Sequence, residues 1–360
     1  MRVVISAGGS GGHIYPALSI INKIKEKEPN SEFLYIGTHN RMEKDIIPKY
    51  NIPFESIEIY GINRKNIFKN FKTLRCFFKA RKKCKNLIKN FNPDVVIGVG
   101  GYVTGPVLYS AHKLGYKTFI HEQNSFPGKA NKFISNFADK IAISFVSSED
   151  KFPKGKTVFT GNPCSENAIN VKPANKSEFN LDEKKKLVLF VMGSLGSSKI
   201  NDFLLKTMSL FNNKEYEILF VTGTSSYDEI KNKKFPNNVH VVPYIENMTR
   251  IMKKTDIIVS RAGASTLSEI ISLQIPSILI PSPYVTENHQ FKNAMDLINK
   301  DAAILVEEKD LKGDILVRTI DNLINDEEKI INIKKNLKDM SINDSATKIY
   351  DELKKLVDRK

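Results

Sequence analysis

The sequence predicts an α/β protein built from two doubly wound, Rossmann-like domains that face each other across a cleft. In both halves of the chain, short runs of β-branched and other apolar residues alternate with helical segments. Residues 3–6 and 187–192 are apolar almost throughout, which is typical of strands buried on both faces of a parallel sheet. A glycine-rich turn follows each of these runs, and 360 residues exceed the usual size of one core.

We expect three segments along the chain. Residues 1–163 form an N-terminal domain, and residues 164–340 form a C-terminal domain. The charged, helical segment at residues 341–360 is a C-terminal helix that can pack back onto the N-terminal domain.

The composition indicates a soluble globular protein, with 41% hydrophobic and 26% charged residues. Cys76, Cys84 and Cys164 have no metal-ligand or redox spacing, which favours a reducing cytoplasm. The first strand begins at once, so we expect no signal peptide. The longest uncharged run, residues 95–111, contains several glycines and a proline, which is typical of a strand, a loop and a helix start and not of a membrane span.

The first half begins with a strand and a glycine loop. The loop at residues 7–13 is neither a Walker motif nor a dinucleotide fingerprint, but it leaves a surface without side chains that a ligand can approach closely. His13 lies at the start of the following helix, where it could act as a general base or simply hydrogen-bond to loop carbonyls. The later strands of this half are predicted at residues 33–37, 52–59, 94–99, 117–121 and 140–144.

Three polar residues stand at the carboxyl end of one of these strands: Glu122, Gln123 and Asn124. Polar side chains in such a run must find hydrogen-bond partners, so ligand contact is a better explanation for them than packing.

The second half repeats the pattern, and its most informative stretch is residues 260–269. A buried-type strand at 257–260 leads into Gly263, and we expect Ser265 or Thr266 to cap the following helix. A helix amino end at the carboxyl edge of a sheet is suited to binding phosphate or diphosphate. Arg261 adds a positive charge beside it, and Glu269 could accept hydrogen bonds from a ribose diol. The alternative interpretation is an ordinary strand-to-helix turn in which the Arg forms a salt bridge and the Glu is solvated. The other strands are predicted at residues 218–222, 239–242, 277–280 and 303–306.

The net charge of +15 is concentrated in one segment. Residues 64–89 contain eleven Lys and Arg and no acid, which leaves the rest of the chain with a charge of +4. A core helix with a solvated basic face is one interpretation, but the number of large apolar residues favours a patch that binds an anionic membrane surface. No nucleic-acid motif is present, so we do not expect nucleic acid as a partner. The predicted membrane patch consists of Ile67, Phe68, Phe71, Leu74, Arg75, Phe77, Phe78, Lys79, Arg81 and Lys82.

Seven short motifs together resemble the MurG family of peptidoglycan glycosyltransferases, in the order of that family. They are Gly-Gly-Ser-Gly-Gly-His at 8–13, Gly-Gly-Tyr-Val-Thr-Gly-Pro at 100–106, His-Glu-Gln-Asn at 121–124, Gly-Asn-Pro at 161–163, Gly-Ser at 193–194, the run 261–269, and Asn-His-Gln-Phe-Lys-Asn-Ala at 288–294.

The resemblance implies the two-domain GT-B architecture, with residues 1–163 facing the acceptor and the membrane and residues 164–340 binding the UDP-sugar. It also implies a role for individual residues. The main chain of Ile245 would meet the uracil, and Glu269 the ribose hydroxyls. Ser194, Ala264, Ser265 and Thr266 would surround the diphosphate together with Arg261, and Leu267 and Ser268 complete this part of the donor site. Gln290 and Asn124 would contact the N-acetylglucosamine, with Ser10, Gly11 and Gly12 closing from the other domain.

Two positions depart from the family pattern. Ser165 stands where the family usually has Arg, so one charged donor contact is missing and donor affinity would depend more on Arg261. His289 stands where the family commonly has Gln, and we assign it no contact.

The implied reaction is an inverting transfer of N-acetylglucosamine from UDP-N-acetylglucosamine to the 4-hydroxyl of the muramyl sugar of lipid I, which gives lipid II. It contributes to peptidoglycan synthesis and so to cell wall biogenesis, cell shape and cell division. The base would be His13, with Glu122 as second choice. No Asp-x-Asp motif lies in a suitable loop, so we expect neither a metal nor a cofactor beyond the donor substrate.

The partners implied are UDP-N-acetylglucosamine, lipid I and an anionic membrane, with the protein peripheral on the cytoplasmic face of the cell membrane. The alternatives are a glycolipid synthase of the same superfamily, a UDP-sugar epimerase of the same architecture, and a non-catalytic subunit that binds a nucleotide-sugar.

Overall fold

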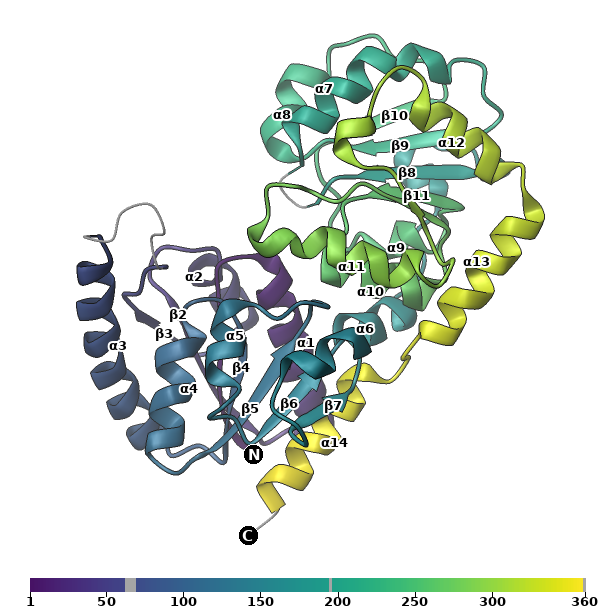
Figure 1. Ribbon diagram of the computed structural model, residues 1–360. Coiled ribbons are helices and arrows are strands. Elements are labelled where there is room, and N and C mark those ends of the chain that lie inside the picture. Colours follow the sequence, from purple (N-terminus) through teal and green to yellow (C-terminus); the bar gives the residue numbers. More distant parts are fainter. Residues whose placement is uncertain (62–68, 194–195, 359–360) are drawn as a thin grey trace. The chain divides into compact units, whose positions relative to one another are not determined.

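The chain forms two compact units in the computed structural model, which describes residues 1–61, 69–193 and 196–358 (Figure 1). One unit consists of Met1–Cys164 together with Asp344–Lys360, and the other of Ser165–Asn343. Each contains one sheet whose described strands all pair in parallel. The predicted class, two doubly wound α/β domains, is confirmed.

The sheet of the first unit has the strand order β3-β2-β1-β4-β5-β6-β7. Its strands are β1 (Arg2–Ala7), β2 (Glu32–Thr38), β3 (Phe54–Ile57), β4 (Val95–Gly100), β5 (Lys117–Glu122), β6 (Lys140–Ile143) and β7 (Thr157–Phe159). The helices of this unit are α1 (Gly11–Lys27), α2 (Glu43–Ile46), α3 (Lys69–Phe91), α4 (Thr104–Lys113), α5 (Lys129–Ile134) and α14 (Ser345–Asp358), with short 3₁₀ helices at Ile47–Tyr50 and Val146–Lys151.

Alternate side chains of the central strand β1 enter two different cores, as the pleat of a strand requires. Val3 and Ile5 are fully buried on the face covered by α1 and α14, whereas Val4 is buried on the face covered by α3 and α4. Helix α14 therefore contributes to the core of the first unit, where Ile349 and Leu353 are fully buried.

The sheet of the second unit has the strand order β10-β9-β8-β11-β12-β13. Its strands are β8 (Leu187–Val191), β9 (Glu217–Val221), β10 (Val239–Val242), β11 (Ile257–Ser260), β12 (Ser277–Leu279) and β13 (Ile304–Leu305). Its helices are α7 (Ser198–Thr207), α8 (Thr224–Ile230), α9 (Thr249–Met252), α10 (Ala264–Leu273), α11 (His289–Ile298), α12 (Ile315–Ile324) and α13 (Glu327–Met340). Helix α6 (Cys164–Asn170) stands at the boundary of the units, and 3₁₀ helices occur at Lys176–Phe179, Met208–Phe211, Thr286–Asn288 and Glu308–Asp310.

The strand order reverses between β1 and β4 in the first sheet and between β8 and β11 in the second. In open parallel sheets, ligands bind outside the carboxyl ends of the strands at such a reversal. The loops that start there follow Ala7 and Gly100 in the first unit, and Val191 and Ser260 in the second. These are the glycine-rich turns that the sequence singled out.

The uncharged run at residues 95–111 forms strand β4, a glycine loop and most of helix α4, as predicted. Within the described parts of the chain, no helix combines the length and the apolar character needed to cross a bilayer.

Candidate functional site

Two glycine loops of the first unit lie in direct backbone contact. The amide of Gly8 donates a hydrogen bond to the carbonyl of Gly100 at 3.1 Å. Gly101 has a φ of +90°, and a Cβ atom there would lie 2.3 Å from the carbonyl oxygen of Gly8. Any side chain at this position would force the loops apart, so the site of the first unit is lined by backbone.

His13 is positioned by the first of these loops, in the first turn of α1. Its Nδ1 lies 3.0 Å from the carbonyl oxygen of Gly8. A carbonyl can only accept, so Nδ1 carries the hydrogen in this bond and Nε2 is the basic nitrogen of the neutral ring. The ring packs on Gly100, where a Cβ atom would lie 2.6 Å from the Cδ2 atom of His13. The hydrogen bond to the loop is therefore present and leaves a role as general base open.

Glu43 also holds the glycine loop, although no sequence motif pointed to this residue. Its buried carboxylate accepts hydrogen bonds from the amide and hydroxyl of Thr38, at 2.9 and 2.6 Å, and from the amide of Gly9 at 3.1 Å. The residue lies in the four-residue helix α2. Because its partner Gly9 is 34 positions away, only the folded structure identifies it.

Glu122, our second candidate for the base, is buried at the end of β5 and orders the loop that follows. One carboxylate oxygen accepts from the backbone amide and side-chain amide of Asn124, both at 3.0 Å. The other accepts from the amide of Gly128 at 3.0 Å and from Asn131 at 2.9 Å. Four hydrogen bonds occupy the lone-pair directions of a carboxylate, so the geometry favours an ordering role over proton transfer. Asn124 is held in a half-buried position by this arrangement.

His121 precedes Glu122 and is completely buried. Its Nε2 lies 3.1 Å from the carbonyl oxygen of Gly161, and its Nδ1 lies 3.0 Å from the side-chain nitrogen of Gln123. Burial disfavours the charged ring and lowers the pKa of His121 to about 4. This histidine therefore stays neutral and serves as a structural link between β5 and the loop after β7.

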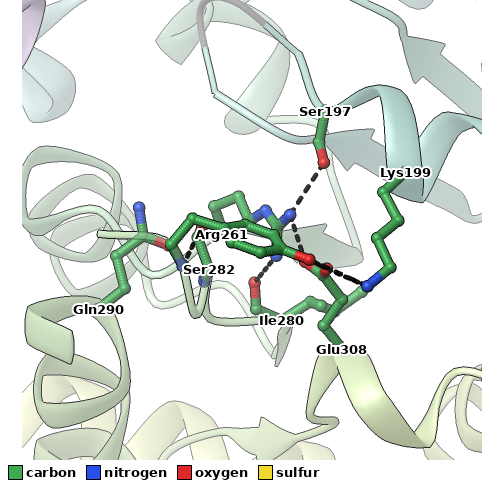
Figure 2. Close-up of polar contacts among 8 residues, drawn as sticks. Ser197, Lys199, Arg261, Ile280, Ser282, Gln290 and Glu308 are labelled. Carbon is green, nitrogen blue, oxygen red and sulfur yellow. Dashed lines mark hydrogen bonds and ion pairs between the residues drawn. The ribbon is translucent and has the colours of Figure 1, made fainter. Parts of the chain in front are cut away.

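Arg261 lies in the loop after β11 and is a buried hub of the second unit. Figure 2 shows its guanidinium donating to the carbonyl of Ile280 at 3.1 Å, to Ser197 Oγ at 2.8 Å and to Glu308 Oε2 at 2.7 Å. The side chain is 9% exposed and that of Glu308 is 3% exposed. We expected Arg261 to present its charge beside a phosphate, but in the structure this charge is already balanced by a carboxylate.

The helix that follows, α10, begins at Ala264 and has Gly263 as its N-cap residue. The prediction that Ser265 or Thr266 caps this helix is wrong, because the helix begins earlier and Gly263, two residues before Ser265, takes the cap position. Glycine has no side chain with which to cap, so the N-cap residue leaves the first backbone N–H groups of the helix unsatisfied. The helix therefore presents open donors and the positive end of its dipole.

Three other predicted residues of this helix are buried, and a fourth, Ser265, has a buried hydroxyl. Ala264 and Leu267 are buried, and Ser268 donates its hydroxyl hydrogen back to the carbonyl of Ala264 at 2.8 Å. Ser265 Oγ is buried and has no hydrogen-bond partner among the described residues. These contacts give Leu267 and Ser268 roles within the helix and leave Ser265 as an unsatisfied hydroxyl at its amino end.

Glu269 lies one turn into α10 and is partly buried. Burial raises the pKa of its carboxyl to about 7. Across the described part of the chain, no residue forms an ion pair or hydrogen bond with this carboxyl. A carboxyl group in such surroundings is available to accept hydrogen bonds from a ligand.

Other predicted donor residues are placed as follows. Gln290, in α11, accepts the backbone amide of Ser282 through Oε1 at 2.8 Å, which fixes its side chain (Figure 2). Ile245 is buried in the loop after β10. Ser10, Gly11 and Gly12 belong to the first unit, at the start of α1, and Ser194 lies outside the described residues.

Ser165 and His289, the two residues that depart from the family pattern, each form a hydrogen bond within the second unit. Ser165 is buried in the first turn of α6 and donates to the carbonyl of Ile342 at 3.2 Å. Nδ1 of His289 lies 2.8 Å from the carbonyl of Thr286.

The predicted membrane patch lies along α3. Arg75, Phe78, Lys79 and Lys82 are exposed, whereas Phe77 and Arg81 are half-buried. The Arg81 guanidinium stands 4.5 Å from the ring centre of Tyr109 in α4. Ile67 and Phe68 lie outside the described residues, and so do the side chains of Phe71 and Leu74.

Among the residues that the structure describes, no group of three His, Cys, Asp or Glu side chains is arranged to hold a metal ion.

Comparison with known proteins agrees with the fold and the loops. Residues 3–143 match the model of the glycosyltransferase family 28 N-terminal domain, and residues 187–350 match that of the family 28 C-terminal domain. A UDP-N-acetylglucosamine--N-acetylmuramyl-(pentapeptide) pyrophosphoryl-undecaprenol N-acetylglucosamine transferase of Bacillus thuringiensis is 47% identical over 99% of this chain and 100% of its own length. A transferase of the same name from Bacillus pumilus is 46% identical over 99% of both chains.

Among solved structures, the chain is similar to MurG of Acinetobacter baumannii, with a TM-score of 0.80 and 25% identity over 98% of this chain and 99% of the other. It also shares its fold with the calicheamicin glycosyltransferase CalG4, with a TM-score of 0.74 and 9% identity over 99% and 98% of the two chains.

The buried His121 gives the protein a pH-dependent stability. Its pKa falls from 6.5 in the unfolded chain to about 4 in the fold, so the unfolded state binds the proton more tightly. The contribution is complete above pH 6.5 and is lost as the pH falls toward 4. We expect a loss of about 3 kcal/mol across this window. Urea unfolding of the wild type and of His121→Gln at several pH values measures it, and equal pH slopes for the two proteins would contradict the assignment.

Proposed function

The chain belongs to glycosyltransferase family 28, and from this premise we propose that it transfers N-acetylglucosamine from UDP-N-acetylglucosamine to lipid I, giving lipid II. The observation that carries the proposal is identity of 46–47%, over essentially the whole chain, with transferases named for this reaction. Lipid I is a muramyl pentapeptide on a polyprenyl diphosphate, so the protein acts in peptidoglycan synthesis.

The donor half of the proposed site is the carboxyl edge of the second sheet. The uncapped amino end of α10 offers backbone N–H groups and a helix dipole to the diphosphate, with the unsatisfied hydroxyl of Ser265 beside them. Glu269 accepts the ribose hydroxyls, and the main chain of Ile245 contacts the uracil. Gln290 offers its remaining amide hydrogens to the sugar, because its oxygen is already bonded to the amide of Ser282.

The reaction forms a bond between the acceptor 4-hydroxyl oxygen and the anomeric carbon while the bond from that carbon to the diphosphate breaks. Negative charge develops on the departing UDP, where the amino end of α10 stabilises it. The hydroxyl proton passes to a base, which we assign to Nε2 of His13. The hydrogen bond between its Nδ1 and Gly8 fixes the tautomer that this role requires.

The acceptor is anchored in a bilayer, so we propose that the protein sits on the cytoplasmic face of the membrane through α3. Exposed Arg75, Lys79 and Lys82 supply charge for anionic lipids, and exposed Phe78 supplies an apolar contact with the interface. Phe77 and the cation–π contact of Arg81 with Tyr109 connect this surface to the fold.

The first prediction tests the reaction and its base together. Purified protein should transfer labelled N-acetylglucosamine to a short-chain lipid I analogue, and His13→Ala should lower kcat by about 10²–10⁴-fold, because the hydroxyl proton loses its acceptor. Diacylglycerol and a reaction without acceptor serve as controls. Transfer to diacylglycerol, or donor consumption without acceptor, would identify a different reaction, and full kcat in His13→Ala would exclude this base.

The second prediction concerns Glu269 and pH. Only the ionised carboxylate accepts hydrogen bonds at both oxygens, and the pKa of Glu269 is about 7. Because the diphosphate diester of the donor does not titrate in this range, affinity for UDP-N-acetylglucosamine should rise about tenfold between pH 6 and pH 8. Calorimetric titrations measure this rise. Glu269→Gln cannot ionise and should bind weakly at every pH, and a persistent rise in this variant would show that another group titrates.

The third prediction concerns membrane binding. Reversal of Arg75, Lys79 and Lys82 to Glu should release the protein from anionic vesicles in a sedimentation assay, since each cation near such a surface contributes about 1 kcal/mol. A matched control reverses Lys329, Lys334 and Lys335, which are exposed on α13 of the other unit. Unchanged sedimentation of the α3 variant, or equal release of both variants, would contradict the proposed surface.

A further inference from the structure

Lys199 lies in the first turn of α7, which follows β8 at the reversal point of the second sheet. Its Nζ atom is 3.1 Å from Glu308 Oε1 and 3.0 Å from the hydroxyl of Tyr284. Glu308 Oε2 binds Arg261 at 2.7 Å, so a single carboxylate is shared between two cations. Figure 2 shows the Lys199 side chain extending from its helix toward this carboxylate.

The cluster of Arg261, Lys199 and Glu308 has two cations and one carboxylate, so its net charge is +1. The hydrogen bonds that Lys199 donates to Tyr284 and Glu308 raise the pKa of Lys199, which keeps the amine protonated. Burial works to raise the pKa of Glu308, but its hydrogen bonds with Arg261, Lys199 and Tyr284 outweigh burial and lower it. The neighbouring Glu307 pairs with Lys309 at 3.0 Å and does not join the cluster. The two cations and the carboxylate therefore lie next to the loop that leads from β11 into α10.

The two cations differ in their freedom to move. Arg261 is buried and tied to three partners from three loops, so it cannot leave Glu308 without exposing a buried carboxylate. The side chain of Lys199 is 64% exposed and sits on a flexible four-carbon stem. A doubly charged ligand that arrives at this edge can compete with Glu308 for Lys199 and not for Arg261.

A second feature of the chain, the uncharged residue Ser165, also bears on the need for a cation here. The resemblance to the MurG family implies an Arg at the position of Ser165, whose short side chain is buried here and donates to the carbonyl of Ile342. It provides no charge to a donor.

We propose that Lys199 is a diphosphate-binding residue of the donor site, held within reach by Glu308, and that it supplies the positive charge that Ser165 does not. The inference rests on the proposed function, because it assumes that a nucleoside diphosphate binds at the amino end of α10.

The experiment is calorimetric titration of the full-length protein with UDP and with uridine. Lys199→Ala should weaken UDP binding about tenfold, as expected for loss of one charge-assisted contact, and should leave uridine binding unchanged. Lys199→Arg keeps the charge and should bind UDP within about twofold of the wild type. Lys309→Ala is the matched control, since Lys309 is exposed to a similar degree, lies next to Glu308 in the sequence and forms its ion pair with Glu307.

The following results would contradict the proposed role of Lys199. If Lys199→Ala binds UDP as tightly as the wild type, or weakens UDP and uridine equally, Lys199 does not bind the diphosphate and the proposed function stands unaffected. If Lys309→Ala loses as much affinity as Lys199→Ala, the effect is one of general charge and the inference fails. If the wild-type protein binds no UDP, the proposed function itself fails and the inference fails with it.

Discussion

The buried ion pair between Arg261 and Glu308 organises the carboxyl edge of the second sheet. A guanidinium removed from water without a partner would cost several kcal/mol, so the arginine must keep its carboxylate and its hydrogen bonds to Ser197 and Ile280. These partners follow β8, β12 and β13, while Arg261 itself follows β11. The pair therefore fixes four loops against one another, and the amino end of α10 starts from a rigid base.

In the first unit, the glycine loops are held by close backbone packing and by a buried carboxylate. Its loops after β1 and β4 approach so closely that only glycine fits at Gly101, and the buried carboxylate of Glu43 holds the amide of Gly9. The hydrogen bonds that this carboxylate accepts from Gly9 and Thr38 all come from neutral donors. A surface of backbone and one imidazole results, which suits a sugar hydroxyl and its proton, whereas the second unit suits charge.

The sequence was sufficient for those features that depend on neighbours along the chain. The strand, glycine turn and helix at 257–273 and the position of His13 at a helix start follow from local periodicity and turn residues, and the structure has both. The cap of α10 was predicted wrongly because several adjacent residues can cap and local sequence does not choose among them. The pairs Arg261–Glu308 and Glu43–Gly9 span 47 and 34 positions, and no periodicity encodes which loops will meet.

The same long-range contacts change what Arg261 can do. The sequence alone suggests that Arg261 is a free cation next to the amino end of a helix. Because Ser165 carries no charge, Arg261 would then be the main positive charge available to a diphosphate. Held by Glu308, it carries no unbalanced charge, so the donor site that we propose must draw its attraction for anions from other groups. Backbone donors of α10 supply part of it. An exposed lysine that shares the same carboxylate can supply the rest, because a ligand can take Lys199 from Glu308 while Arg261 stays behind to keep that carboxylate paired.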